Sequence, residues 1–250
     1  MDMNKIEFEK KIYEFEKLKS TNDWMIENLK KINFNEGNIV FTLNQSDGRG
    51  MRNSKWFSEK NKSLTFSLLL KPNFLKLDYL FDLSICVSIS IIEVLHKINN
   101  NFKLKWPNDI YFDKYKVGGI LIENQINKNK LEKSIVGIGL NINNSNFTFL
   151  ENSSSLFLIS KKKYKIKDIM LCILEKIEER YNDLICGGYE KLKKKYLKNL
   201  LYFNVFRDYI EKDGNKVNGK ICNVDRHGFL IIEFENGHKK KYFHKEIKFI

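Results

Sequence analysis

Two short stretches of the chain gather residue types suited to binding a phosphate or carboxylate ligand. The first, QSDGRGMRNSKW at 45–56, holds Arg49 and Arg52 among glycines. The chain has 44 basic residues and all but five are lysines. Two planar guanidinium groups in one glycine-containing loop therefore indicate a site for phosphate or carboxylate. Trp56 offers a ring face on which a base can stack. The alternative interpretation of the whole stretch is a surface turn with incidental arginines.

The second stretch is KWPNDIYFDKYKVGGILIEN at 105–124. FKLKW is typical of a short strand that ends at Pro107, and KVGGILIEN of a buried strand. Gly118 and Gly119 would let a ligand or another backbone come close. We expect these two strands to form a hairpin around the turn FDKY. Taken alone, the pattern also fits a plain hairpin in which Lys116 is an ordinary solvated lysine.

A third stretch, GIGLNIN at 137–143, places Gly137, Gly139, Asn141 and Asn143 on one side of a strand. The glycines would leave room for a flat ligand. An asparagine amide offers one donor side and one acceptor side to the edge of a base. The motif is weak when it occurs alone.

The elements that must position these stretches mix helices and strands. Apolar spacing predicts helices over 5–19 and 22–32, with Ser20-Thr21-Asn22 as N-cap of the second. Further strands are predicted at NIVFTLN, SLTFSLLL and SIVGIGLNIN, and further helices at 79–98, 167–186 and 188–202. We expect an α+β catalytic domain with a mixed, mainly antiparallel sheet over 1–203. Short strands between DGN, DRHG and ENG turns predict a separate small β-barrel over 204–250.

Composition excludes several classes of protein. With 250 residues and 42% hydrophobic residues, the chain is long and apolar enough for a large core. The apolar run at 80–95 contains Asp82 and Glu93, so it predicts a buried helix rather than a membrane span. The charged beginning of the chain is unlike a signal peptide. Four widely spaced cysteines suit reduced core thiols. We therefore expect a cytoplasmic protein without membrane contact or structural metal.

A net charge of +13 raises the alternative of a basic nucleic-acid-binding protein. The lysines are spread over the whole chain rather than gathered in one patch. That alternative explains the charge but neither the arginine loop nor the glycine-containing strands.

Taken together, five motifs resemble those of the biotin protein ligases, in their order and approximate spacing. They are STN at 20–22, Q-x-x-GRG-x-R-x-x-x-W at 45–56, KWPND at 105–109, K-x-GGIL-x-E at 116–123 and G-x-G-x-N at 137–141. The resemblance implies a catalytic domain like the class II aminoacyl-tRNA synthetase core, followed by an SH3-like barrel. It also implies the reaction: biotin and MgATP give biotinyl-5′-AMP and pyrophosphate, and a lysine of a carrier protein then takes the biotinyl group. A lipoate or octanoate ligase of the same fold is the nearest alternative.

The resemblance also assigns roles to single residues. Biotin would contact Ser20, Thr21, Asn22, Gln45, Gly48, Arg49, Lys116, Gly118 and Gly119. The nucleotide would contact Arg52, Trp56, Asn108, Asp109, Gly137, Gly139 and Asn141. Lys116, Arg49 and Arg52 would be the catalytic cations that offset developing charge. Asp109 is the candidate for a contact to the nucleotide through Mg²⁺.

The chain departs from the family pattern in the arginine loop. Met51, Asn53 and Ser54 stand where many relatives carry Arg or Gln, Gly, and Arg. We therefore expect the adenylate to be held less tightly. Only 19 residues precede STN, too few for the winged helix-turn-helix of some relatives, so we expect no specific DNA binding. The resemblance implies a biotin carboxyl carrier protein or domain of acetyl-CoA or another carboxylase as partner. A homodimer paired through sheet edges is compatible with it.

Overall fold

The computed structural model describes residues 5–148, 150 and 152–250. Its helices are α1 (Thr21–Asn28), α2 (Phe81–Leu95), α3 (Leu156–Ser160), α4 (Ile166–Ile185) and α5 (Tyr189–Asn199), and its 3-10 turns are η1 (Met51–Asn53) and η2 (Leu77–Tyr79). The first nine strands are β1 (Ile12–Phe15), β2 (Ile39–Thr42), β3 (Gly48–Arg49), β4 (Lys55–Trp56), β5 (Ser63–Leu70), β6 (Phe102–Lys105), β7 (Asp109–Phe112), β8 (Tyr115–Asn127) and β9 (Lys130–Asn141). The last five are β10 (Phe206–Glu211), β11 (Lys216–Val224), β12 (Leu230–Phe234), β13 (Lys239–Tyr242) and β14 (Ile247–Phe249).

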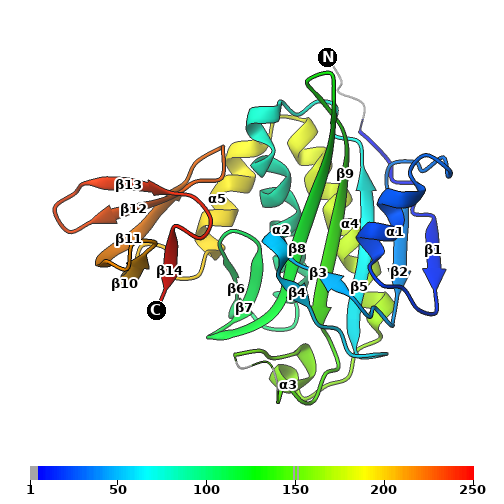
Figure 1. Cartoon of the computed structure of the whole chain (residues 1–250), viewed down its shortest axis with the longest axis horizontal. Coiled ribbons are helices and arrows are strands. Elements are labelled where there is room, and N and C mark those ends of the chain that lie inside the picture. Colours follow the sequence, from blue (N-terminus) through cyan, green and yellow to red (C-terminus); the bar gives the residue numbers. More distant parts are fainter. Residues whose placement is uncertain (1–4, 149, 151) are drawn as a thin grey trace.

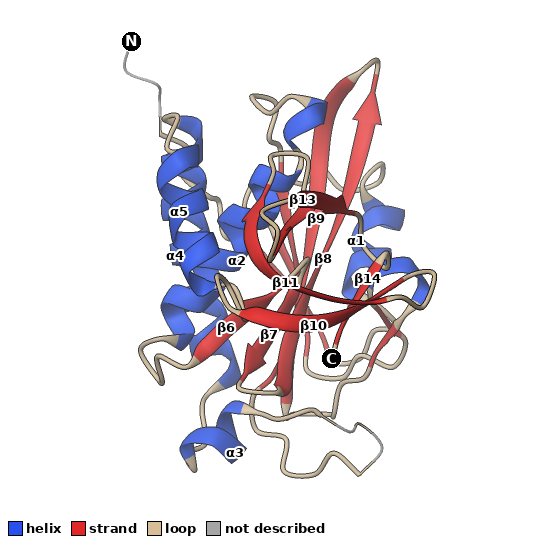
Figure 2. Ribbon diagram, turned by 90° about the vertical axis from the view of Figure 1, so that its left-hand side faces the viewer, coloured by secondary structure: helices blue, strands red, loops and turns tan. Residues whose placement is uncertain are grey.

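A seven-stranded sheet in the order β1-β2-β5-β9-β8-β7-β6 forms the centre of the molecule (Figure 1). Only the β1–β2 pair is parallel, among the strand pairs described. Helices α2, α4 and α5 lie on one side of this sheet, and α1 lies on the other (Figure 2). The predicted α+β class with a mixed, mainly antiparallel sheet is confirmed.

Alternation along the strands assigns each side chain to one face of the sheet. Val40, Leu69 and Ile135 pack with Met25 of α1 in one buried cluster. Their strand neighbours belong to the larger core on the other face, with α2, α4 and α5. In β9, Gly137 and Gly139 have the same parity as Ile135, so they face the α1 side. Gly137 and Gly139, two residues of the third motif, therefore lie on the face of the sheet that carries α1.

The prediction of a helix over 5–19 is wrong. Residues 12–15 instead form the edge strand β1, parallel to β2 with Ile12 opposite Ile39. Tyr13 and Phe15 are two residues apart and both pack around Trp24. That spacing of two is strand periodicity, and pairing with β2 outweighs the helix-like spacing of the wider segment.

The expected hairpin between FKLKW and KVGGILIEN is also incorrect. The residues DIYF form an additional strand, β7, that lies between β6 and β8. The turn FDKY therefore joins β7 to β8, while Trp106 and Pro107 form the turn from β6 to β7. A four-residue strand beside a motif with proline carries too little periodicity to be recognised from sequence.

The C-terminal residues form a five-stranded antiparallel sheet in the order β13-β12-β11-β10-β14. Trp106 donates from its indole nitrogen to the Gly228 oxygen at 3.0 Å, which ties this sheet to the large one. Arg226 donates twice to the fully buried Asp82 of α2 and lies over the rings of two tyrosines. Burial raises the pKa of Asp82. The two sheets thus meet beside the KWPND motif.

The four cysteines are free thiols, but Cys186, at the end of α4, is exposed rather than part of the core. Among the described residues, no helix is long and apolar enough to cross a membrane.

Candidate functional site

The N-terminus of α1 forms one wall of a cavity on the α1 face of the large sheet. Ser20 is the predicted N-cap: its hydroxyl oxygen accepts from the Asp23 amide at 3.2 Å. The Thr21 amide donates to Gln45 Oε1 at 2.8 Å. Helix start and arginine loop are therefore joined by a hydrogen bond between two predicted motifs.

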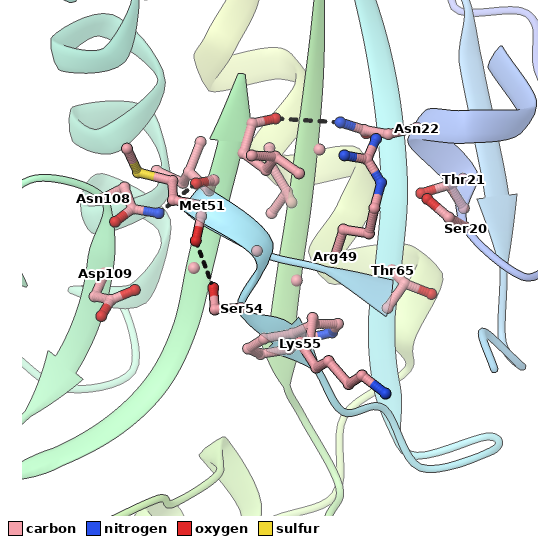
Figure 3. A pocket seen from close by; sticks show the side chains of 18 of the residues that line it. Ser20, Thr21, Asn22, Arg49, Met51, Ser54, Lys55, Thr65, Asn108 and Asp109 are labelled. Atoms are coloured by element: carbon pink, nitrogen blue, oxygen red, sulfur yellow. Dashed lines mark hydrogen bonds between the residues drawn. The ribbon is translucent and has the colours of Figure 1, made fainter. Parts of the chain in front are cut away.

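The cavity has a volume of about 270 Å³. Figure 3 shows Ser20, Thr21, Asn22 and Arg49 on one side of it and Asn108 and Asp109 on the other. Of the sixteen residues assigned from sequence, twelve line the cavity: Ser20, Thr21, Asn22, Gln45, Arg49, Trp56, Asn108, Asp109, Lys116, Gly119, Gly137 and Gly139. Motifs separated by more than a hundred residues thus meet in one place.

The end of the cavity near α1 is polar, and its groups are largely paired with one another. Ser20 and Thr21 are each only 4% exposed. Thr21 Oγ1 lies 2.8 Å from Ser67 Oγ and 3.3 Å from Gln45 Oε1. The Ser20 hydroxyl oxygen accepts from the backbone, so its proton remains available, and so does the amide nitrogen of Gln45. This end therefore presents both donors and acceptors to a ligand.

The opposite end carries charge. Lys116 Nζ lies 2.6 Å from Asp109 Oδ1, and both side chains are partly exposed. A Cβ added at Gly119 would stand 3.8 Å from Lys116 Nζ and 3.4 Å from Asp109 Oδ1. The glycine therefore leaves open space next to the ion pair, where a ligand can lie against the ammonium.

Asn108 fixes the KWPND turn to the neighbouring strand. Its side-chain amide donates to the backbone oxygen of Ile120 at 2.7 Å, and the backbone amide of Ile120 donates to the backbone oxygen of Asn108 at 3.0 Å. The Trp106–Pro107 peptide bond is cis. The turn leads into β7, whose first residue, Asp109, lies opposite Gly119 of β8.

Arg49 is surrounded by carboxylates. Its guanidinium contacts Asp23 of α1 and donates to both oxygens of Glu123 on β8, at 2.9 and 2.8 Å. The hydrogen bond that Arg49 donates to the Asp23 carboxylate is the main cause that raises the pKa of Arg49. In this arrangement the charge of Arg49 is offset inside the protein.

The glycines of β9 make room for other side chains. A Cβ at Gly137 would lie 2.5 Å from Asn22 Oδ1, and one at Gly139 would lie 2.5 Å from the Trp56 ring. The buried Trp56 indole nitrogen has no hydrogen-bond partner among the described residues. The space that these glycines leave therefore receives Asn22 and Trp56, and these side chains form the floor.

Four of the assigned residues lie outside the cavity lining in the described structure: Gly48, Arg52, Gly118 and Asn141. Gly118 faces the other side of the sheet, where a Cβ would lie 2.2 Å from the Leu140 side chain. Asn141 donates to the Ser154 oxygen at 3.0 Å. Arg52 donates to the His244 oxygen at 3.2 Å and lies over the Phe243 ring. Gly48 pairs with Trp56 in the β3–β4 ribbon.

Sequence reasoning did not find the contribution of the C-terminal sheet or of Glu123. His244 and Lys245, from the turn before β14, line the cavity. Burial lowers the pKa of His244, and the charges of Arg52 and Lys245 lower it further. No motif marks this turn, because its position depends on contacts between the two sheets. Glu123 is the last residue of the K-x-GGIL-x-E motif, but sequence reasoning assigned it no role. The structure shows that it contacts Asn22 and Arg49.

Asp109 is the carboxylate at the charged end of the cavity that could hold a metal ion. Within the described residues, no three His, Cys, Asp or Glu side chains form a metal-binding group. Mg²⁺ in nucleotide sites commonly takes one or two carboxylates, with phosphates and water as its other ligands. One carboxylate at the charged end fits that pattern.

Comparison with known proteins agrees with this geometry. A profile of the Biotin/lipoate A/B protein ligase family matches residues 14–141, about half of the chain. The chain belongs to this family, and within it to the biotin protein ligases.

Solved and curated relatives support the same conclusion. The biotin protein ligase of Aquifex aeolicus in complex with biotin and ATP is 29% identical, with a TM-score of 0.78 over 96% of this chain and 98% of that one. A mutant of the Aquifex protein in complex with biotin is 30% identical, with a TM-score of 0.76 over the same shares of the two chains. The bifunctional ligase/repressor BirA of Bacillus spizizenii is 27% identical over 212 residues, which are 83% of this chain and 65% of that protein. The chain thus spans slightly less than two thirds of this curated relative.

Proposed function

We propose that the protein is an ATP-dependent biotin protein ligase. It would join biotin to ATP as biotinyl-5′-AMP, release pyrophosphate, and transfer the biotinyl group to a lysine of a carboxyl carrier protein or domain. The observation that carries the proposal is a single cavity with a buried, hydrogen-bonding end at Ser20, Thr21 and Gln45 and a charged end at Lys116 and Asp109. The Aquifex relative, crystallised with biotin and ATP, supports it.

The polar end suits a cyclic urea. The carbonyl oxygen of a urea accepts hydrogen bonds, and the Ser20 hydroxyl and the Gln45 amide nitrogen are donors in reach of this end. The urea N–H groups donate, and Thr21 Oγ1 has acceptor capacity. A dithiolane ring or a plain alkyl chain would leave these buried groups unpaired. Such mismatches lower kcat/KM for the wrong substrate by about 10⁴ relative to the right one.

The charged end suits the chemistry at the carboxylate. In the first step a biotin carboxylate oxygen bonds to the α-phosphorus while pyrophosphate leaves. In the second step the carrier amine, having lost a proton to water, bonds to the acyl carbon while AMP leaves. Lys116 is held beside Gly119, so its ammonium can stabilise negative charge that grows on the oxygens in both steps. Mg²⁺, when it is bound with ATP at Asp109, would neutralise phosphate charge.

The remaining assignments are part of this proposal. Asn108 and Trp56 would contact the nucleotide, and residues 204–250 would act as a C-terminal domain that adds His244 and Lys245 to the site. A homodimer, if formed, would use a sheet edge, and β1 is one edge of the large sheet.

The decisive experiment measures exchange of labelled pyrophosphate into ATP with biotin, lipoate or octanoate as the acid. We expect exchange with biotin only, and a mass increase of one biotinyl group on a purified carrier domain. Exchange supported by lipoate or octanoate instead of biotin would assign the chain to the other branch of the family. The carrier assay is needed because adenylate formation alone does not demonstrate transfer.

A further inference from the structure

Glu123 is not among the residues that line the cavity, but it contacts two residues that do. It is on β8, opposite Ile135, and therefore on the same face of the sheet as Leu121 and Gly119. Its carboxylate accepts from Asn22 Nδ2 at 2.8 Å and from Arg49 at 2.9 and 2.8 Å. One side chain thus holds a residue of the STN motif and a residue of the arginine loop.

The contact to Asn22 fixes the orientation of a buried amide. Asn22 is 4% exposed, and its amide oxygen accepts from the Ser67 hydroxyl. Because the Glu123 carboxylate can only accept, a reversed Asn22 amide would turn its oxygen toward the carboxylate, and two acceptors would face each other without a hydrogen bond. Ser67 Oγ also lies 2.8 Å from Thr21 Oγ1. A chain of polar contacts through Asn22 and Ser67 therefore links Glu123 to Thr21, which lines the cavity.

The contact to Arg49 fastens the loop at 45–58. The guanidinium bridges Asp23 of α1 and Glu123 of β8, so the loop is tied to two elements at once. Gly48, next to Arg49, pairs with Trp56, and Gln45 of the same loop accepts from the Thr21 amide. With two carboxylates around it, Arg49 is arranged to hold the loop in place.

We propose that Glu123 is a positioning residue for the urea-binding end of the cavity, acting through Asn22 and Arg49. It sets the Asn22 amide and closes the Gln45 loop against α1, so that Ser20, Thr21 and Gln45 stand in the geometry that binds the ring. The inference rests on the proposed function. It assigns Arg49 to the binding of biotin through loop position rather than to the phosphates.

The test compares Glu123→Gln with the matched control Glu132→Gln. Glu132 is an exposed carboxylate on β9 that also accepts from an asparagine, Asn127, at 2.8 Å. For Glu123→Gln we expect the KM for biotin to rise about 10- to 100-fold, the range for a lost charged hydrogen bond. We expect kcat at saturating biotin and the KM for ATP to stay within about threefold of wild type. The control should match wild type in all three quantities.

Arg49→Gln and the double variant complete the test. If Glu123 acts through Arg49, the KM for biotin of the Glu123→Gln, Arg49→Gln double variant should be no more than about threefold above that of the single variant with the higher KM. Limited proteolysis should cut the 45–58 loop faster in both single variants, a change that a phosphate-binding role for Arg49 does not predict. Glu123→Asp, whose shorter side chain cannot reach both partners, replaces Glu123→Gln if that variant does not fold.

Three results separate the possibilities. Unchanged biotin KM in Glu123→Gln and Glu123→Asp would overturn the inference. A loss of kcat of about 10²–10³ in Arg49→Gln with unchanged biotin KM would also overturn it, because that is the signature of a transition-state contact. Absence of biotin-dependent exchange in the wild-type protein would instead contradict the proposed function.

Discussion

The two ends of the cavity differ in how their polar groups are satisfied. At the α1 end, Ser20, Thr21 and Asn22 are buried, and Thr21 and Asn22 are bound to Gln45, Ser67 or Glu123. At the other end, Lys116 and Asp109 are partly exposed and form a simple ion pair. Buried, mutually fixed groups favour selection of a ligand by shape and hydrogen bonding, because a mismatch leaves a group unpaired. A partly exposed ion pair beside open space suits stabilisation of negative charge that develops on a ligand during a reaction. The proposed function therefore places recognition of the ligand at the α1 end and the chemical steps at the charged end.

The largest expected effect is at the charged end. Lys116→Ala removes the ammonium beside Gly119 and should reduce the rate of adenylate formation by about 10²–10³, or about 3–4 kcal/mol. ATP binding and thermal stability should change little, because Lys116 is a partly exposed side chain paired only with Asp109 among the described residues. Single-turnover formation of biotinyl-adenylate measures the effect. Retention of the rate within about threefold would mean that Lys116 is an ordinary surface lysine.

The charged end also depends on the attachment of the C-terminal sheet. Arg226→Ala would leave the fully buried Asp82 without its guanidinium partner, which typically costs about 3–5 kcal/mol. We expect a loss of about 3 kcal/mol in the free energy of unfolding, the lower end of this range, because Arg226 is 39% exposed. Urea unfolding measures it. In Asp82→Asn together with Arg226→Ala the loss should be much smaller, and an equal loss would contradict the ion-pair explanation.

The polar end should respond in binding rather than in rate. Gln45→Leu removes the acceptor of the Thr21 amide and a donor of the cavity, and should weaken biotin binding by about 10- to 100-fold, or about 1.5–3 kcal/mol. Isothermal titration with biotin alone gives this number. An unchanged Kd would show that the ring of biotin binds elsewhere.

The smallest expected effect concerns retention of the adenylate. Met51 lines the cavity and has no charged group for the phosphate. Met51→Arg would add a guanidinium at this position, and one charge-assisted contact should extend the lifetime of bound biotinyl-adenylate about tenfold. Release is followed after free biotin and ATP are removed. If the lifetime is the same as in wild type, other loop residues already supply the contact.

The resemblance to the biotin protein ligases supplied most of the cavity residues, and local rules supplied part of the framework that positions them. The Ser20 cap and the one-sided glycines of β9 are consequences of residue type and of strand alternation. The strand β1 was missed because its pairing with β2, not its own spacing, decides its conformation. His244 was missed because its place in the cavity depends on contacts such as Trp106 with Gly228, more than a hundred residues apart. The partners of Arg49 were missed for the same reason.

The division between recognition and chemistry is tested most directly by one crossed measurement. The Kd for biotin alone and the single-turnover rate of adenylate formation at saturating biotin are determined for wild type, Gln45→Leu and Lys116→Ala. We predict that Gln45→Leu raises the Kd about 10- to 100-fold and leaves the rate within about threefold, whereas Lys116→Ala lowers the rate about 10²–10³-fold and leaves the Kd within about tenfold. If both variants change the same quantity by similar factors, the two ends are not functionally separate and this account of the site is wrong.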